Sequence, residues 1–269
     1  CVIVILLLVI LVPLIWILSL SIRYNEDVFE ILPKKGFTLH NFPEAVYQTD
    51  YWAGLTFFRM FGNSALVSAT SIVVIIVISI LAAFGFSNYT FKGKEIFFIA
   101  FLLGFMIPVQ VLLIPLFVLM KNLSLLNTYF VLILPYAAFG FPIGTLILRS
   151  FFEKIPFEIK ESAKIDGAKD FTILTKIVLP LGRPALATVV IFNFLVVWNE
   201  FLFALVFIRK DFMRTIPVVL NRMIYNPYGI VQYEVYSAMI VLTLIPTLII
   251  FILFQKWFIA GLSSGALKG

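Results

Sequence analysis

The sequence carries little charge for its length. Only 13% of its 269 residues are charged, 62% are apolar, and the mean hydropathy is +1.09. About a quarter of the residues in soluble domains are charged, and no surface facing water could cover so much apolar side chain. The composition excludes a soluble enzyme and indicates a membrane protein.

Cysteine and histidine are almost absent. The single cysteine, Cys1, excludes a disulfide framework, a cysteine zinc site and an iron–sulfur cluster, and the single histidine, His40, excludes a histidine-based metal site. A glycine-rich nucleotide loop is also missing, because the pair Gly93-Lys94 lacks the earlier glycine that a phosphate cradle requires. We therefore expect no metal, no cofactor and no catalytic residue in this chain.

The basic residues are scattered between apolar stretches. A nucleic-acid surface needs cations clustered on one exposed face, so the net charge of +6 predicts no nucleic-acid partner. Lys and Arg favour cytoplasmic loops. With both termini inside, the inner segments hold 11 basic residues and the outer segments 9, so the count alone leaves the orientation open.

Stretches without charge predict six transmembrane helices in an all-α, polytopic fold. Each is close to or above the roughly 20 residues that a helix needs to cross a bilayer, and only Glu200 interrupts one of them. The first is too long for a signal sequence and lacks a cleavage site. The expected spans of this single transmembrane domain are 1–22, 62–88, 96–120, 127–149, 184–208 and 235–256. They leave outer loops 23–61 and 209–234, an inner loop 150–183 and a tail 257–269.

The loop between the fourth and fifth spans concentrates charge. Between Arg149 and Arg183 lie 12 of the 34 charged residues. Gly167 predicts a C-cap turn with positive φ between a helix over 157–166 and a second helix over 168–178, which Pro180 ends. The first helix places Ile159, Ser162, Ala163 and Asp166 on one stripe, which suits a docking partner or an interfacial linker.

The same loop carries a motif. Glu161-Ser162-Ala163, then Gly167 after three residues, then Ile177-Val178-Leu179-Pro180 after nine more, resembles the coupling motif of ABC-importer permeases, Glu-Ala-Ala-x3-Gly-x9-Ile-x-Leu-Pro. Ser162 replaces the middle alanine with another small residue. The coupling residues that this resemblance implies are Glu161, Ser162, Ala163, Asp166, Gly167, Ile177, Leu179 and Pro180.

Further segments resemble the carbohydrate branch of these permeases, and within it the smaller permease subunit of the maltose-transporter type. They are Phe61-Gly62-Asn63-Ser64, Met106-Ile107-Pro108, Leu125-Leu126-Asn127-Thr128-Tyr129, Ile165-Asp166-Gly167-Ala168, Trp198-Asn199-Glu200-Phe201 and the tail from Gly261 to Gly269.

The resemblance implies a multi-pass subunit in a bacterial or archaeal cytoplasmic membrane, with both termini cytoplasmic. Its expected partners are membrane lipid, a second homologous permease, an extracytoplasmic solute-binding protein and an ATPase dimer that binds the 155–180 loop and the C-terminal tail. The outer loop 209–234, with Asn226-Pro227-Tyr228-Gly229 at its tip, resembles a segment that reaches the binding protein, or is a solvated connector. The cargo would be an oligosaccharide, with glycerol phosphate or a polyol as the alternative in the family. A free-standing secondary transporter or channel is the alternative from another class.

Several polar or amphipathic side chains fall within the spans. Such groups need a partner or a wet cavity at that depth, so they are either interhelical hydrogen bonds or contacts for a hydroxyl-rich solute. Glu200 lies near enough to the outer surface to reach water. The candidate substrate path consists of Gln110, Tyr136, Asn193, Trp198, Asn199 and Glu200.

Overall fold

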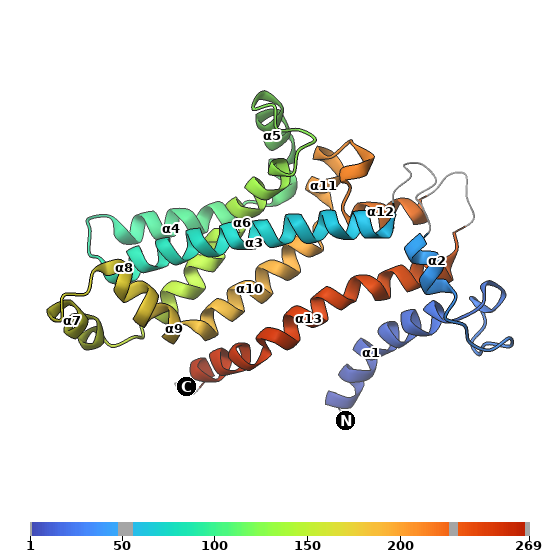
Figure 1. Ribbon diagram of the computed structural model, residues 1–269, viewed down its shortest axis with the longest axis horizontal. Helices are drawn as coiled ribbons and strands as arrows, with labels where there is room; N and C mark the ends of the chain where they lie inside the picture. The colour runs from blue at the N-terminus through green and yellow to red at the C-terminus, as the bar shows by residue number, and fades with distance from the viewer. Residues whose placement is uncertain (1, 48–55, 226–230, 267–269) are drawn as a thin grey trace. The chain divides into compact units, whose positions relative to one another are not determined.

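The computed structural model describes residues 2–47, 56–225 and 231–266 (Figure 1). Within these ranges the chain is helical, apart from turns and one isolated β-bridge between Arg23 and Phe37. The chain divides into two compact units, one of residues 1–65 and 200–248 and the other of residues 66–199 and 249–269. The predicted all-α fold class is confirmed.

The first unit contains the N-terminal segment 1–65 and the segment 200–248, which begins inside the fifth predicted span. Helices α3 and α13 each contribute one part to this unit and the other part to the second unit. Its elements are α1 (Val2–Ser21), η1 (Asn25–Asp27), α2 (Asn41–Tyr47), the start of α3 (Phe57–Asn88), α11 (Leu202–Phe207), η3 (Asp211–Met213), α12 (Ile216–Ile224) and the start of α13 (Tyr233–Ala266).

Buried polar side chains organise the first unit. Arg23, which follows α1, is 3% exposed and donates hydrogen bonds to the carbonyls of Asp27 and Ile31, both at 3.3 Å. Asn41 donates its amide to the carbonyls of Ser21 and Arg23 at 3.0 and 2.8 Å. The bond to Ser21 satisfies a carbonyl that the end of α1 leaves without a helical partner, and the others fix the segment that follows. The segment after α1 is therefore a folded cap and not only a loop.

The second unit holds the packed helices and the charged loop. Its elements are the remainder of α3, α4 (Lys94–Phe105), α5 (Val109–Asn122), α6 (Phe130–Phe152), α7 (Phe157–Ile165), α8 (Asp170–Ile173), a π-helical turn (Leu174–Val178), α9 (Leu179–Leu181), α10 (Arg183–Trp198) and the end of α13. Helices α6 and α10 lie side by side, and α4 also packs against α6 (Figure 1).

Two glycines one turn apart allow α6 to approach its neighbours. A Cβ on Gly140 would lie 2.5 Å from both Asn193 Oδ1 on α10 and Ile75 Cδ1 on α3. A Cβ on Gly144 would meet Ser79 on α3 and would lie 3.3 Å from Val189 on α10. Small residues at this spacing are the usual device for close helix packing in a membrane, where burying apolar surface drives association only weakly.

Helix length and composition agree with a membrane protein. Of the described residues, four segments are long and apolar enough to cross a bilayer: Ile3–Ser21, Phe57–Asn88, Phe130–Phe152 and Tyr233–Ile259. Two sharply bent pairs, α4 with α5 and Asp170–Leu181 with α10, bring the number to six if each pair is one span. Six is the number that the uncharged stretches predicted.

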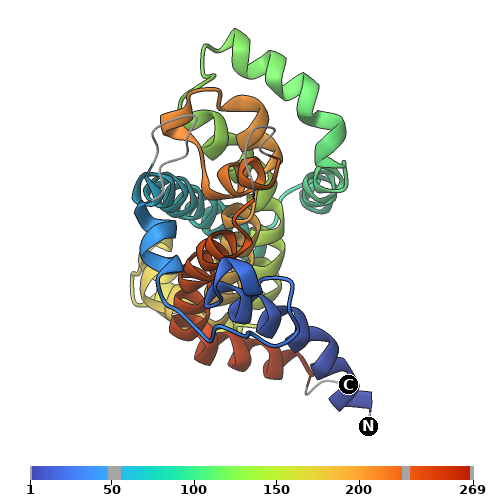
Figure 2. The same ribbon diagram turned by 90° about the vertical axis from the view of Figure 1, so that its right-hand side faces the viewer.

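The third predicted span, 96–120, is broken into two helices. Helix α4 ends at Phe105, and α5 begins at Val109 at an angle of 94° to it (Figure 2). Pro108 is the N-cap residue of α5. Proline lacks an N–H group and disfavours the helical conformation at the residue before it, so Pro108 favours a break at this position.

The fifth predicted span, 184–208, also differs from a single helix. Helix α10 ends at Trp198 and α11 begins at Leu202. Asn199 turns its amide back onto the Leu195 carbonyl at 2.8 Å. The Glu200 carboxylate accepts backbone N–H groups at the start of α11, from Phe203 at 2.8 Å and Ala204 at 3.3 Å. Capping side chains of this kind end one helix and begin the next.

The boundaries of the predicted outer loops and of the predicted tail also differ from those in the structure. The predicted outer loop 23–61 contains α2 and the first turn of α3, and 209–234 contains α12. The predicted tail 257–269 continues α13 as far as Ala266, and Leu267, Lys268 and Gly269 lie outside the described residues. The segment Asn226 to Gly229, predicted as a loop tip, also lies outside them.

Valine at Gly140 or at Gly144 should destabilise the helix packing of the second unit. The new side chain must displace Asn193, Ile75 or Ser79, and overpacking of this kind typically costs about 1–3 kcal/mol. We expect a lower thermal unfolding midpoint for the purified protein in detergent. Gly85→Val is the matched control, because a Cβ at Gly85 on α3 meets no atom within 4 Å. An equal loss in all three variants would mean that helix propensity, and not close approach, explains the effect.

Candidate functional site

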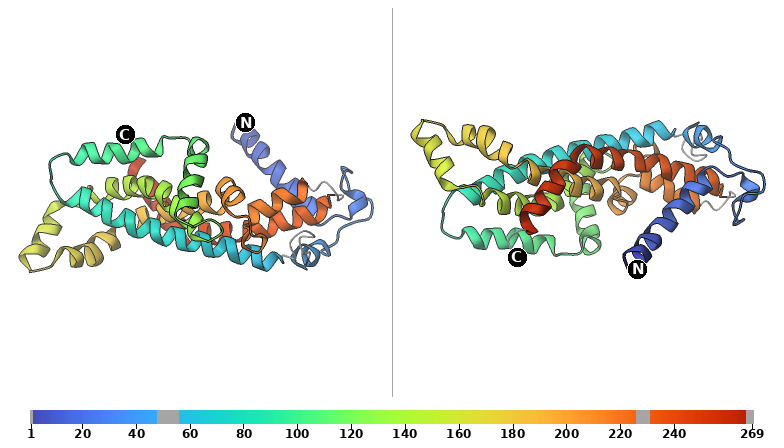
Figure 3. Two further views of the ribbon diagram at one scale, coloured as in Figure 1. Left: turned by 90° about the horizontal axis from the view of Figure 1, so that it is seen from above. Right: turned by 90° about the horizontal axis from the view of Figure 1, so that it is seen from below.

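The charged loop folds into a helical hairpin around Gly167. Helix α7 ends with Asp166 as its C-cap, and Gly167 has a φ of +81°. The N–H of Ala168 donates to the Ala163 carbonyl at 2.9 Å, and the N–H of Gly167 donates to the Lys164 carbonyl at 3.0 Å. These two bonds form a Schellman motif, in which a glycine with positive φ closes the helix and reverses the chain. Figure 3 shows α7 and α8 as a hairpin beyond the ends of α3 and α6.

The second arm of the hairpin differs from the predicted helix over 168–178. It begins at Asp170, passes through the π-helical turn and continues as α9 to Leu181. Pro180 therefore does not end it. The π turn widens the backbone directly before the proline, where a regular helix would clash with the ring. The chain instead bends by 77° between Leu181 and Arg183, at Gly182.

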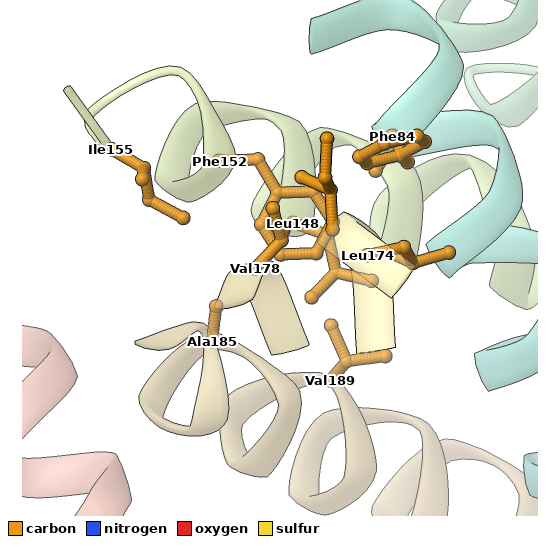
Figure 4. Close-up of a cluster of buried hydrophobic side chains, with 10 residues drawn as sticks. Phe84, Leu148, Phe152, Ile155, Leu174, Val178, Ala185 and Val189 are labelled. Atoms are coloured by element: carbon orange, nitrogen blue, oxygen red, sulfur yellow. The ribbon is translucent and has the colours of Figure 1, made fainter. Parts of the chain in front are cut away.

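An apolar cluster attaches the hairpin to the helix bundle. The cluster joins the end of α3, the end of α6, the second arm of the hairpin and the start of α10 (Figure 4). Its centre is fully buried and includes Phe152, Ile173 and Val178. Its members are Ala83, Phe84, Leu148, Phe152, Ile155, Ile173, Leu174, Val178, Ala185 and Val189. A displacement of the hairpin must therefore displace three membrane helices, because a close-packed core deforms little.

A polar contact joins the hairpin to the segment after α3. The Tyr89 hydroxyl donates a short hydrogen bond to the Asp170 carboxylate, and Lys164 Nζ lies 3.5 Å from the same carboxylate. The bond raises the pKa of the Tyr89 phenol and lowers the pKa of Asp170. Tyr89 and Asp170 are 81 positions apart, so no pattern in the sequence predicts this contact.

The predicted coupling residues divide between two faces of the hairpin. Ala163 and Leu179 are partly buried against the apolar cluster, and Ile177 is half-buried. The exposed members are Glu161, Ser162, Asp166, Gly167 and Pro180. Of the predicted stripe, Ile159, Ser162 and Asp166 are exposed, whereas Ala163 also packs partly against the cluster.

Large apolar side chains also lie on the hairpin surface. Phe157 is 63% exposed, Ile165 82% and Phe171 74%. These side chains lie outside the predicted spans. Exposed apolar groups rimmed by charge are typical of a protein–protein contact.

A buried arginine fastens α4 to α6. Arg149, in the last turn of α6, is 9% exposed and donates to Glu95 at 2.6 Å and to Glu153 at 2.7 Å. Its Nη1 has no hydrogen-bond partner, and the guanidinium lies 4.1 Å from the centroid of the Phe98 ring. An aromatic face is a favourable neighbour for such a cation. In the sequence, Arg149 is recognisable only as one of the charged residues of the loop between the fourth and fifth predicted spans.

Among the candidate path residues, Asn193 lies between α10 and α6, and Tyr136 is buried on α6. Tyr136 is 6% exposed, and Asn193 is 2% exposed and donates to the Val189 carbonyl at 2.9 Å. Asn193 Oδ1 occupies the space beside Gly140, one turn after Tyr136 on α6. In this conformation Asn193 is thus a packing residue with an internal hydrogen bond.

The remaining candidates occupy different surroundings. Gln110 is exposed in the first turn of α5, and Asn199 is exposed at the end of α10. Trp198 is 5% exposed and stacks on Phe194, with ring centroids 5.4 Å apart. Glu200 belongs to the first unit, where it caps α11. The role of the six candidates in a substrate path stays a prediction.

Comparison with known proteins identifies the family. Residues 75–264 match the family described as "Binding-protein-dependent transport system inner membrane component". The chain is 36% identical over 259 residues to the "Probable ABC transporter permease protein YurM" of Bacillus subtilis, with 96% of this chain and 83% of that protein covered. It is 37% identical over 262 residues to the arabinooligosaccharides transport system permease protein AraQ of Halalkalibacterium halodurans, with 96% and 91% covered.

A solved structure shares the fold. A crystal structure of a bacterial ABC transporter involved in the import of the acidic polysaccharide alginate contains a chain that matches with a TM-score of 0.82 and 24% identity, over 96% of this chain and 94% of that one. The fold, the motif-bearing hairpin and the family match agree with one another. This chain belongs to the family of binding-protein-dependent transport system inner membrane components, and is a permease subunit of an ABC transporter and not an enzyme.

Proposed function

We propose that this permease imports an uncharged oligosaccharide as one half of a heterodimer, together with a solute-binding protein and a separate ATPase dimer. The hairpin of residues 155–180 docks on the ATPase, and the end of α13 reaches the same subunits. Both termini are then cytoplasmic, because six spans place them on one side and the hairpin must face the ATPase. The permease acts in the cytoplasmic membrane of a bacterium or archaeon.

The hairpin is the observation that carries this proposal. It presents exposed Glu161 and Asp166 beside the apolar side chains of Phe157, Ile165 and Phe171, while its opposite face belongs to the core. An apolar centre with charged residues around it is how a specific protein contact is usually built. Because the apolar cluster packs the hairpin against α3, α6 and α10, a movement of the hairpin can be transmitted to these helices.

The carbohydrate cargo rests on relatives and on charge. AraQ is named for arabinooligosaccharides, and the chain covers 91% of that protein at 37% identity. The interiors of α5, α6 and α10 carry cations only near helix ends, at Lys121, Arg149 and Arg183. A phosphorylated solute such as glycerol phosphate would require a cation deeper in the path. An uncharged sugar, bound by amides and aromatic faces, fits this lining better.

Replacing Gly167 by valine should uncouple the transporter. An L-residue at a φ of +81° costs about 1–2 kcal/mol, and a β-branched residue costs more, so the hairpin should open or shift. We expect the ATP hydrolysis that loaded binding protein stimulates in the assembled transporter to fall strongly.

Gly167→Asn is the matched control for this test, because asparagine tolerates positive φ. A Cβ at this position meets no atom within 4 Å in the free permease, so the asparagine should keep the turn. If Gly167→Val is stimulated as well as the unmodified transporter, the proposed docking through this hairpin is wrong.

Alanine at Asn199 and alanine at Asn193 should have different effects. Asn199 is exposed at the end of α10, so Asn199→Ala should lower sugar uptake and leave assembly and basal ATP hydrolysis intact. Asn193 fills space beside Gly140, so Asn193→Ala should leave a void and lower the thermal unfolding midpoint. Uptake in vesicles and thermal unfolding of the purified complex measure the two effects. Normal uptake by Asn199→Ala would remove this residue from the path.

A further inference from the structure

Lys160 on α7 is a buried cation without a countercharge. The residue is 4% exposed, and its Nζ donates to the Phe152 carbonyl at 3.3 Å. Within the described part of the chain, no carboxylate lies within 4.0 Å of this Nζ. An ammonium group has three N–H donors, so a single long bond leaves it poorly satisfied. Burying an ammonium in this way is unfavourable unless an anion approaches.

Lys160 lines a cavity between α7 and the end of α3. The cavity has a volume of about 340 Å³, whereas a water molecule occupies about 30 Å³ in the liquid, so it has room for a side chain. Its lining residues are Asn88, Phe157, Lys160, Glu161, Lys164 and Ile165. The charged lining residues are Lys160, Lys164 and Glu161, and Lys164 has its own carboxylate partner in Asp170.

The charges around Lys160 do not compensate it. Lys164, one turn further on, interacts with Asp170 at 3.5 Å, and Glu153 uses its carboxylate on Arg149. Burial lowers the pKa of Lys160, and Glu153 opposes this only at long range. The structure thus keeps a cation in a place where its charge is poorly stabilised in the isolated permease.

We propose that the cavity receives a carboxylate side chain of the ATPase, which forms an ion pair with Lys160 when the hairpin docks. This inference rests on the proposed function, which brings the ATPase to the hairpin. Phe157 and Ile165, two exposed apolar residues, also line the cavity. A partner that covers these two side chains excludes water from the ion pair, and such a desolvated contact dominates binding. A carboxylate suits the site because it supplies a full negative charge as well as hydrogen-bond acceptors.

The test compares Lys160→Met with Lys160→Arg in the permease heterodimer, reconstituted in lipid nanodiscs. Methionine keeps the apolar stem and loses the charge, whereas arginine keeps the charge. We expect Lys160→Met to raise the Kd of the ATPase by about tenfold or more, as truncation of one partner in a buried charge pair does. Lys160→Arg should stay near the original Kd, and Lys154→Met, an exposed lysine in the same loop outside the cavity, should change nothing.

Three outcomes would overturn the inference. An unchanged Kd in Lys160→Met would show that no charge pair forms. A lower thermal midpoint together with weaker binding in both Lys160 variants would assign the lysine to the internal bond with Phe152. Stabilisation of the isolated permease by inorganic phosphate, lost in Lys160→Met with an unchanged Kd, would assign the cavity to a small anion. Gly167→Val distinguishes a failure of the ion-pair inference from a failure of the docking proposal. If that variant also binds the ATPase normally, the docking proposal itself fails.

Discussion

Phe152 is the contact on which the connection between the hairpin and the membrane helices depends. Its ring is fully buried at the end of α6, and a Cβ on Gly182 would lie 2.8 Å from that ring. Its carbonyl accepts the hydrogen bond from Lys160 on α7. One residue therefore contacts both the first arm of the hairpin and the bend that follows the second arm. Because packed interiors shift between discrete arrangements more readily than they stretch, a force on α7 is transmitted to α6 and α10 as a unit.

Glycine serves two separate purposes in this transmission. At Gly140, Gly144 and Gly182 the missing side chain allows close approach, and the backbone conformation is ordinary. At Gly167 there is free space around the position, but the positive φ makes any other residue except asparagine unfavourable. The first group holds the helices together where lipid provides little driving force, and the second sets the direction of the hairpin that leaves them.

Prolines in this chain bend the backbone at some positions and lie within continuous helices at others. Pro108 separates α4 from α5 at 94°, whereas Pro135 and Pro142 lie inside the continuous helix α6. Membrane helices tolerate internal prolines when neighbours and side chains satisfy the freed carbonyls. The exposed amide of Gln110 lies in the first turn of α5, directly after the bend at Pro108. Interrupted helices of this type are where transporters commonly contact their solutes.

Composition and local pattern determined the fold class, the number of apolar stretches and the position of the hairpin, because each depends on residues near one another in the chain. The spacing of Gly140 and Gly144 is also a local signal, because small residues four positions apart indicate close helix packing in a membrane. Tertiary structure alone decided which side of each element faces inward: it buried Lys160, packed Ala163 partly against the apolar cluster, joined Tyr89 to Asp170, and set Asn193 against Gly140. These contacts join segments distant in sequence or depend on which helix packs opposite, and the periodicity of a single apolar helix does not encode its neighbour.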